Sequence, residues 1–469
     1  MIDRAPALVT YRPDLLGARC DVCPLALWRE GGPVGPEIHP GQRCVVGETP
    51  GEQEVALGRP FVGVSGVLLT DALRRVGVRR DEISWLNAGA CRPHKNDLQV
   101  LVQRMQAENN RRARAGFIEP KLVHPVEACR PRLFRELRAF SDIIAVGKAA
   151  VQGVMGGKPR SILAIRGGMV EGYLLDPDHP SGLGFIAAEG GWKDGPPAAT
   201  PEEHEIHTRW ARRIRLLPTV HPAFVLRAPR WHRVFRSDLH RAARWFDGLN
   251  NWVEPTVTYT PTPEQLRAWL SKLTIAAYDT ETDGLECLTV NLRCVSIGTD
   301  REGMVIPFLG VDGRRTFYDP LEEKQIRDIL RAWFVDQNCV KIGWNQGYYD
   351  RAVIKHHFKV VPTPIVDGML LHRLVESELP HNLGFAASIY AALSPAWKAD
   401  HTATEAKDDD VLWRYAGLDA VQTYRVFGPL AEHVKMRRQE YVLKVVDAPM
   451  QVVCADMHEV GMYIDQKRR

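Results

Sequence analysis

The sequence predicts two α/β domains in one chain, on the basis of its length, its alternation of elements and its charge. A chain of 469 residues is too long for a single hydrophobic core. Apolar strand-like runs alternate with helical patterns in both halves, which is typical of sheets that bind ligands at their carboxyl edge. Residues 1–250 hold 36 basic and 27 acidic side chains, whereas residues 251–469 hold 25 and 30. A basic half suits a polyanionic partner, and an acidic half can meet one through bound cations.

The composition narrows the class of protein further. Hydrophobic residues make up 45% of the chain and charged residues 25%, as in ordinary globular proteins. No run of about 18 apolar residues predicts a membrane span. The opening MIDRAPALVTYRPD does not resemble a secretory signal, so we expect a cytoplasmic protein. In that compartment, clustered cysteines favour metal ligation over disulfides.

The first domain is expected over residues 1–250 and begins with a loop-rich segment. Buried strands are predicted within 44–51, 83–91, 140–156 and 215–227, and helices within 66–78, 140–156 and 239–249. Residues 95–120 are polar and arginine-rich, which predicts an insertion or a mobile loop. Glycine, proline and acidic residues at 174–206 predict a surface excursion.

The second domain is expected over residues 266–430, after a linker at 251–265. Three prolines and four threonines in the linker interrupt any helix. A strand is predicted at TIAAYDTETDGL and a strand pair at VSIGTDREGMVIPF. Helices are predicted at 322–335, 348–358, 365–377, 408–425 and 428–457.

Acidic residues at three places in the second domain predict a site for divalent cations. Asp279 and Glu281 are two apart on a strand, so both carboxylates point to one face. Asp350 begins a predicted helix, and Tyr415 and Asp419 are four apart on one helical face. Two Mg²⁺ or Mn²⁺ ions need about this many oxygen ligands, with positions left for phosphate and water. Each fragment is common alone, but their order and contexts together favour metal-assisted phosphodiester hydrolysis.

Residues 275–427 resemble the proofreading 3′→5′ exonuclease of family A DNA polymerases, in its tyrosine variant. The resemblance rests on AYDTETDGL, GWNQGYYDRAVI, HNLGFAASIY and YAGLDAVQTYRVF. It implies a ribonuclease H-like fold and a set of four metal ligands, namely Asp279, Glu281, Asp350 and Asp419. It also implies that Tyr415 orients the attacking water.

Two further features extend this resemblance. Leu285, four residues after Glu281, matches the family position that packs against the terminal base, and Asn345 is expected to contact the substrate. DAPMQVVCADMHEVGMYID at 447–465 resembles the opening of the polymerase domain, so residues 431–469 are expected to begin that domain. No polymerase carboxylates follow, which predicts either a longer parent protein or a separate polymerase. Such a combination of modules resembles those of bacteriophages, with a bacterial host cytoplasm as the compartment.

Four residues of the first domain predict chemistry on a nucleobase. Glu48 lies in a Gly-Pro-rich turn after a strand, where it can position water or stabilise a sugar cation. Phe61 offers a flat face for a flipped base. Asn87 can pair with the edge of a pyrimidine, and His221 can donate to a carbonyl oxygen of a leaving base.

The region from about residue 15 to residue 247 resembles family 4 uracil-DNA glycosylases, through GETPG, GRPFVG, NAGACRP and HPAFVLR. The resemblance implies an α/β/α sandwich in which Glu48 is the catalytic acid, Phe61 the stacking aromatic and Asn87 the uracil-reading amide. His221 matches the histidine of the family's last motif. Residue 49 and the run 52–54 depart from the usual first motif. A domain that only binds DNA, or is only structural, is therefore the alternative.

The order of the cysteines fits the same family. Cys20, Cys23, Cys91 and Cys129 match its C-x2-C followed by two distant cysteines, which implies a 4Fe–4S cluster. Zinc at the same four thiols is the alternative. The gap between Cys91 and Cys129 is longer than the family norm and contains residues 95–120.

The segment from residue 209 to residue 244 contains ten arginines interleaved with aromatic residues. Arginines neutralise phosphates and aromatic rings stack on bases, so DNA is the expected partner. We expect Arg227, Arg230 and Arg233 to contact phosphates. The expected substrates are single-stranded or mismatched DNA that contains uracil, and frayed 3′ ends.

Overall fold

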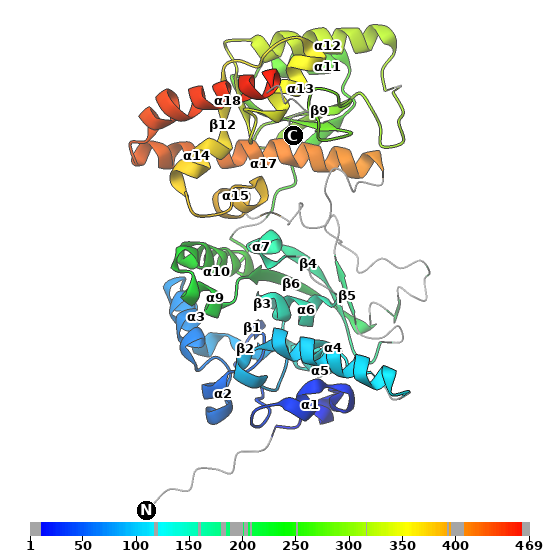
Figure 1. Cartoon of the computed structure of the whole chain (residues 1–469), viewed down its shortest axis with the longest axis vertical. Helices are drawn as coiled ribbons and strands as arrows, with labels where there is room; N and C mark the ends of the chain where they lie inside the picture. The colour runs from blue at the N-terminus through cyan, green and yellow to red at the C-terminus, as the bar shows by residue number, and fades with distance from the viewer. Residues whose placement is uncertain are drawn as a thin grey trace, which may run out of the picture. The chain divides into compact units, whose positions relative to one another are not determined.

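The computed structural model of the chain forms two compact units, Met1–Asn251 and Trp252–Arg469 (Figure 1). The structure describes residues 11–116, 121–157, 161–179, 184–187, 200, 205–206, 209–249, 252–315, 317–391, 394 and 408–461. Within those residues, no helix combines the length and the apolar character needed to cross a membrane.

The first unit is built on a six-stranded sheet in the order β2-β1-β3-β6-β4-β5. The strands are β1 (Arg43–Gly47), β2 (Ser84–Asn87), β3 (Asp142–Val146), β4 (Val170–Leu175), β5 (Gly184–Ala187) and β6 (Ala211–Thr219). Strands β2, β1, β3 and β6 are parallel, whereas β4 and β5 pair in antiparallel fashion. The continuous apolar runs of β1 and β3 are buried, as expected for parallel strands covered on both faces.

Helices cover both faces of this sheet, as the sequence predicts. Helices α3, α9 and α10 lie together on one side, and α5 and α6 on the other (Figure 1). Their bounds, with the other helices of the unit, are α1 (Pro24–Trp28), α2 (Glu52–Leu57), α3 (Val64–Arg75), α4 (Leu98–Arg114), α5 (Pro125–Glu136), α6 (Lys148–Met155), α7 (Ile162–Ile165), α9 (Pro222–Arg227) and α10 (His232–Phe246).

Helix α4 corrects the expectation of a loop at residues 95–120. Leu101 and Met105 are one turn apart and buried, so the polar segment has a narrow apolar stripe. The Asp97 side chain caps the helix by accepting from the backbone N–H of residue 100 at 2.9 Å. Asn109 exchanges two hydrogen bonds with the backbone of Leu122, at 2.8 and 2.9 Å. The arginine content hides this pattern in the sequence.

The second unit also has a six-stranded sheet, in the order β12-β11-β8-β9-β10-β7. Its strands are β7 (Thr256–Tyr259), β8 (Ile275–Thr282), β9 (Leu292–Gly298), β10 (Glu302–Pro307), β11 (Val340–Gly343) and β12 (Ile365–Asp367). Strands β8, β9 and β10 are antiparallel neighbours, which confirms the predicted strand pair. Strand β7 lies inside the expected linker and pairs in parallel with β10.

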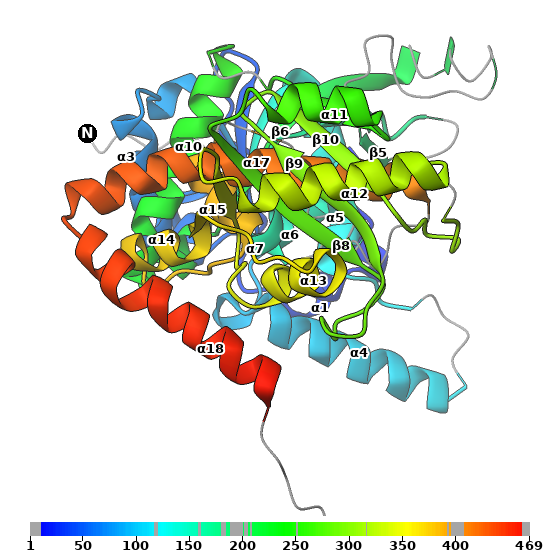
Figure 2. The ribbon, with the colours of Figure 1, turned by 90° about the horizontal axis from the view of Figure 1, so that it is seen from above.

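Helices enclose the second sheet on both faces. Figure 2 shows α11 and α12 on one side of β8–β10 and α17 on the other, where it crosses all three strands. The helices are α11 (Pro263–Leu270), α12 (Pro320–Val335), α13 (Tyr349–Phe358), α14 (Gly368–Val375), α15 (Leu383–Tyr390), α17 (Asp409–Met436) and α18 (Ala448–Val460), with a π-helix η7 (Val442–Asp447) before α18. The predicted break after residue 425 is wrong, since α17 runs through Pro429 and ends beside Arg438, whose φ is +56°.

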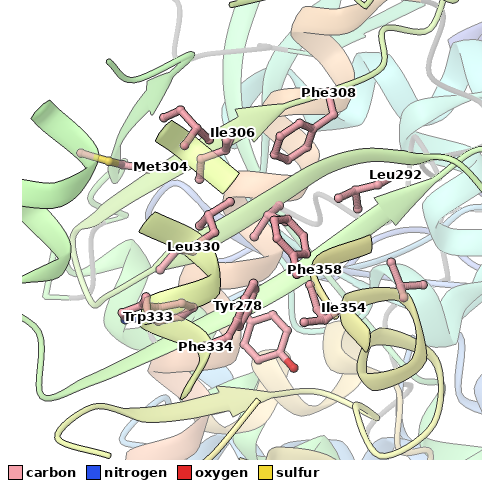
Figure 3. Close-up of a cluster of buried hydrophobic side chains, with 14 of the residues drawn as sticks. Tyr278, Leu292, Met304, Ile306, Phe308, Leu330, Trp333, Phe334, Ile354 and Phe358 are labelled. Atoms are coloured by element: carbon pink, nitrogen blue, oxygen red, sulfur yellow. The ribbon is translucent and has the colours of Figure 1, made fainter. Parts of the chain in front are cut away.

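The core under α12 fixes the direction of the β8 side chains. Tyr278 is fully buried and packs edge-on against Phe334, with ring centroids 5.3 Å apart (Figure 3). Because side chains alternate along a strand, Asp279 and Glu281 point to the opposite face, towards α17. Helix α17 lies close to that face, since a Cβ at Gly298 would be 2.6 Å from the backbone nitrogen of Val421.

Candidate active sites

In the first unit, the carboxyl ends of four parallel strands meet at one edge of the sheet. Glu48 follows β1, Asn87 ends β2, Gly147 follows β3 and His221 follows β6. These residues and Phe61 line one cleft of 1790 Å³. The fold thus gathers four side chains that the sequence analysis singled out at widely separated positions, at the edge where α/β sheets bind ligands.

Two glycines allow these side chains to lie against the sheet. A Cβ at Gly147, whose φ is +95°, would be 2.6 Å from Oε1 of Glu48 and 3.1 Å from Cβ of His221. Glu48 and His221 therefore approach each other across Gly147. Gly47 has the same relation to the other pair, because its Cβ would be 2.4 Å from Oδ1 of Asn87 and 2.5 Å from Cζ of Phe61.

The protonation state of His221 follows from its surroundings. Burial lowers the pKa of His221, and the Glu48 carboxylate partly opposes that shift. The backbone N–H of Ala223 donates to Nδ1 of His221 at 3.2 Å, at the start of α9. A neutral ring that accepts at Nδ1 has its proton on Nε2. His221 is thus a neutral N–H donor, suited to stabilising an oxygen that becomes negative.

Phe61 is held in an uncommon backbone conformation by two residues that the sequence analysis missed. Its φ is +55°, in the left-handed region that aromatic residues rarely adopt. The Glu54 carboxylate accepts from the backbone N–H groups of Phe61 and Gly51. Arg80 donates to the carbonyl oxygen of Phe61 at 3.1 Å, and its guanidinium lies 4.5 Å from the Trp85 ring centroid. In the sequence, the three-residue spacing from Gly51 to Glu54, as in a capping box, could have indicated that Glu54 binds backbone N–H groups.

The four cysteines of the expected cluster lie near one another. Cys23, Cys91 and Cys129 are buried and Cys20 is half-buried. Burial raises the pKa of the Cys20, Cys23 and Cys91 thiols, that of Cys23 to about 12, and the neighbouring Cys129 adds to each shift. Thiols so placed are neutral unless a metal compensates for the charge of the thiolate.

The spacing of these thiols bears on the kind of metal. Among the residues that the structure describes, the group whose ligand atoms all lie within 4.8 Å of one another consists of carboxylates, and the thiols do not form such a group. Tetrahedral zinc, with Zn–S bonds of about 2.3 Å, holds its sulfurs about 3.8 Å apart. No three of the four thiols therefore lie as close to one another as the sulfurs of a zinc site.

The arginine-rich segment divides into buried and exposed members. Arg215 forms an ion pair with Asp142 at 2.7 Å, and Arg241 is buried. Arg227, Arg230 and Arg233 are exposed, and Arg227 lines the cleft. Only the exposed members have the accessibility that contact with a phosphate backbone requires.

In the second unit, three of the predicted carboxylates meet. Ligand oxygens of Asp279, Glu281 and Asp419 lie within 4.8 Å of one another. Strand β8 provides the first two and α17 the third, and Tyr415 lies one turn before Asp419 on the same helix. Three hard oxygen ligands at this spacing are a donor set that fits Mg²⁺ or Mn²⁺.

Asp350 occupies a different position from the other three carboxylates. It lies in the first turn of α13 and accepts from the backbone N–H of Thr280 at 3.1 Å, and from its hydroxyl. The β8–β11 ladder ends at residue 277, so Asp350 continues the hydrogen bonding along that edge of β8. Burial raises the pKa of Asp350 to about 6, although the bonds from Thr280 oppose the shift. The Asp350 carboxylate thus lies next to β8, but it does not belong to the group of Asp279, Glu281 and Asp419, whose oxygens lie within 4.8 Å of one another.

A smaller cleft of 470 Å³ opens beside this group. Asp279, Asp419, Trp344 and Asn345 line it, together with His381–Leu383 and Met369. Asn345 has a φ of +62°, and its backbone N–H donates to the Asp367 carboxylate at 2.9 Å. The sequence analysis gave no role to Trp344, although it lies within GWNQGYYDRAVI, or to Asp367, which lies outside the quoted motifs.

Two more elements lie near the second site. Leu285, after β8, is 84% exposed, as a residue that contacts a substrate base must be. Helix α18 packs on α13 through ion pairs from Arg351 to Asp456 at 2.9 Å and to Glu459 at 3.1 Å. Nε2 of Gln451 donates to the Asp367 carboxylate at 2.5 Å.

Comparison with known proteins accounts for both units. Residues 40–247 match the uracil DNA glycosylase superfamily, and residues 257–435 match the 3′-5′ exonuclease family of DNA polymerase A. The type-4 uracil-DNA glycosylase of Pyrobaculum aerophilum is 28% identical over 50% of this chain and 93% of its own length. That of Thermotoga maritima is 31% identical over 35% of this chain and 78% of its own length.

The second unit is similar to part of a DNA polymerase. DNA polymerase I of Synechocystis is 28% identical over 40% of this chain, and the match spans 20% of the polymerase. Among solved structures, Brucella melitensis NrnC is 19% identical, covering 45% of this chain and 97% of that one with a TM-score of 0.34. The chain therefore belongs to the uracil-DNA glycosylase superfamily through its first unit, and a 3′-5′ exonuclease domain of the DNA polymerase A family follows in its second.

Proposed function

We propose that the first unit removes uracil from DNA and that the second degrades DNA from 3′ ends, in partnership with a DNA polymerase. The observation that supports the first activity best is the meeting of Glu48, Asn87 and His221 with Phe61 at the carboxyl edge of one parallel sheet. The observation that supports the second is the carboxylate group of Asp279, Glu281 and Asp419.

In the first site, one pair of side chains binds the base and the other pair acts on the bond that breaks. Phe61 stacks the extruded base and Asn87 pairs with its edge, since both approach Gly47. Water attacks C1′ of the sugar while the bond to the base breaks, the base takes the bonding electrons, and the proton that the water loses passes to the Glu48 carboxylate. Glu48 positions that water and stabilises the positive sugar. Nε2–H of neutral His221 stabilises the negative oxygen of the departing base.

The test of the first activity is base removal from oligonucleotides that contain a single uracil. We expect the holoprotein to leave abasic sites, detected by strand cleavage in alkali. The Glu48→Ala and His221→Ala variants, purified in the same way, are the control. Loss of activity in them would show that base removal does not come from a contaminating glycosylase. Binding of these oligonucleotides without any abasic product would assign the first unit to DNA binding alone.

In the second site, the residues of this chain hold the cations and orient the substrate. Bound divalent cations supply an activated water molecule and neutralise charge on the phosphate. Asp279, Glu281 and Asp419 hold them, with Asp350 as the fourth ligand that the family resemblance implies. Tyr415 orients the attacking water by a hydrogen bond, Leu285 packs against the terminal base, and Asn345 contacts the substrate strand. Mg²⁺-dependent release of mononucleotides from a 3′-labelled strand is the test.

The cysteines support a separate structural proposal. Cys20, Cys23, Cys91 and Cys129 hold a 4Fe–4S cluster, because their order fits the family resemblance and the four thiols lie near one another. Protein purified without oxygen should be brown and contain iron and sulfide. Stoichiometric zinc without iron would refute the cluster while leaving both proposed activities open to their own tests.

A further inference from the structure

Helix α4 forms one wall of the cleft that contains Glu48 and His221. Gln99, Val102 and Gln106 lie at helical spacing on α4, and all three line the cleft. Gln152 of α6 and Leu163 of α7 line it as well. The volume of 1790 Å³ exceeds the range of about 300–1,000 Å³ that is usual for a small-molecule pocket. The cleft therefore has room for more than the one base that Phe61 and Asn87 engage.

The chemistry of the α4 wall favours bases over phosphates. Its contribution to the cleft consists mainly of amide and aliphatic side chains, and Lys95 at its start is balanced by Asp97. The outside of duplex DNA presents phosphates, which bind to clustered cations. Unpaired nucleotides also expose the flat apolar faces and the hydrogen-bonding edges of their bases. Amides that can donate and accept, next to valine and leucine, match that second kind of surface.

The wall is held in place by the core of the unit. Leu101, on the opposite side of α4, belongs to the same buried cluster as Cys23 and Cys91. Asn109 binds the backbone of Leu122 at the far end of the helix. Because α4 is fixed at both ends, it does not have to be ordered when a ligand binds, which lowers the entropic cost of association.

We propose that α4 forms a subsite for unpaired nucleotides next to the base that is excised. The substrate of the first unit is then a single strand, or a locally unpaired stretch, and not intact duplex. This inference rests on the proposed glycosylase function and specifies its substrate class. Helix α4 lies within residues 95–120, in the gap between Cys91 and Cys129.

The test compares two exposed positions of α4 that line the cleft with one that does not. The full-length Gln99→Ala/Gln106→Ala variant removes the cleft-facing amides, and Gln103→Ala removes an exposed amide outside the cleft. Each variant is assayed on a long single strand with one central uracil, and on a minimal oligonucleotide with one nucleotide on either side of the uracil. Far-UV circular dichroism checks that α4 is intact.

We expect the double variant to raise KM for the long strand about tenfold, as the loss of two hydrogen bonds would do, with kcat unchanged. KM for the minimal oligonucleotide should not change, and Gln103→Ala should match the wild type on both. An unchanged KM for the long strand, or an equal rise on both substrates, would overturn the inference. If the wild type removes no uracil, the proposed activity fails, and fluorescence anisotropy with the same oligonucleotides still decides whether α4 binds them.

Discussion

The two sites meet the same polyanion in opposite ways. The first presents one carboxylate, a neutral histidine, an amide and an aromatic ring, brought together by two glycines that leave no room for a Cβ. The second presents three carboxylates whose oxygens lie within 4.8 Å of one another. The proposed chemistry of the first site therefore needs only side chains of the protein. The carboxylates of the second site repel the phosphates of DNA until cations bind.

The first site is therefore sensitive to the space around its side chains, and the second to the charge of its ligands. In the cleft of the first unit, a single added carbon at residue 47 or 147 would displace the side chains that we propose act on the base. In the second unit, a strand and a helix supply three carboxylates, and the number of ligand oxygens is what matters. Five variants or treatments test this contrast between the two sites.

The largest expected effect is on the carboxylates. Asp279→Ala combined with Glu281→Ala should abolish release of nucleotides from 3′ ends, because both oxygens that β8 contributes to the cations are lost. Uracil removal by the same preparation should be unchanged. Undiminished degradation by the purified double variant would remove this group from the mechanism.

Metal removal should separate the two sites without any mutation. A chelator of divalent cations should stop the exonuclease, and added Mg²⁺ should restore it, since Asp279, Glu281 and Asp419 need a counter-charge to accept phosphate. Base removal should continue in the chelator. If uracil removal stopped as well and returned with Mg²⁺, the contrast between the sites would be wrong.

The next largest loss of activity is expected from variants in the polar groups of the first site. Glu48→Ala and His221→Ala should each lower single-turnover base removal by about 10²–10³, the usual loss for one electrostatic group. DNA affinity, measured by anisotropy, should stay nearly constant because it rests on phosphate contacts. The variants should keep full exonuclease activity. A parallel fall of affinity and rate would mean that these residues only bind DNA.

Gly147→Ala tests the role of shape directly. Its Cβ would lie 2.6 Å from Oε1 of Glu48, on a backbone with a φ of +95°. A displacement of Glu48 by a fraction of an ångström to an ångström should lower the rate by up to about 10². Gly157→Ala is a matched control, since its φ is +65° and its Cβ would meet nothing within 4 Å. Equal losses from the two variants would indicate backbone strain in place of crowding.

The smallest effect should come from the exposed arginines. Arg230→Ala should weaken DNA binding a few-fold and lower the salt dependence of affinity by about one phosphate contact. The rate at saturating DNA should not change. Arg215→Ala would be a misleading control, because Arg215 is paired with Asp142 inside the fold.

Much of the fold was predictable because the patterns are local. The strands that end at Glu48 and Asn87, the β8 carboxylates and the helix with Tyr415 and Asp419 all follow from alternation and helical spacing. Helix α4 was not predictable as a helix, since its two buried residues stand among arginines and amides. Its place in the cleft depends on packing against residues far away in the sequence.

The residues that orient the groups of each site were harder to predict from the sequence. Arg80 holds Phe61 through a backbone carbonyl oxygen, which leaves no side-chain pattern, and for Glu54 the sequence offers only its spacing from Gly51. The bond between Asp350 and Thr280 depends on where the β8–β11 ladder ends. Sequence motifs therefore indicated the groups that the structure gathers at the two sites more reliably than the groups that support them.

Helix α18 has a practical consequence for the nuclease. The Gln451 side chain occupies the space beside Gly347, where a Cβ would lie 1.9 Å from it, and donates to Asp367. Asp367 in turn accepts from the backbone of Asn345. An exonuclease fragment cut after α17 would retain every predicted ligand and yet lose a donor that steadies the loop beside them. Rates measured on such a fragment would then understate those of the full-length protein.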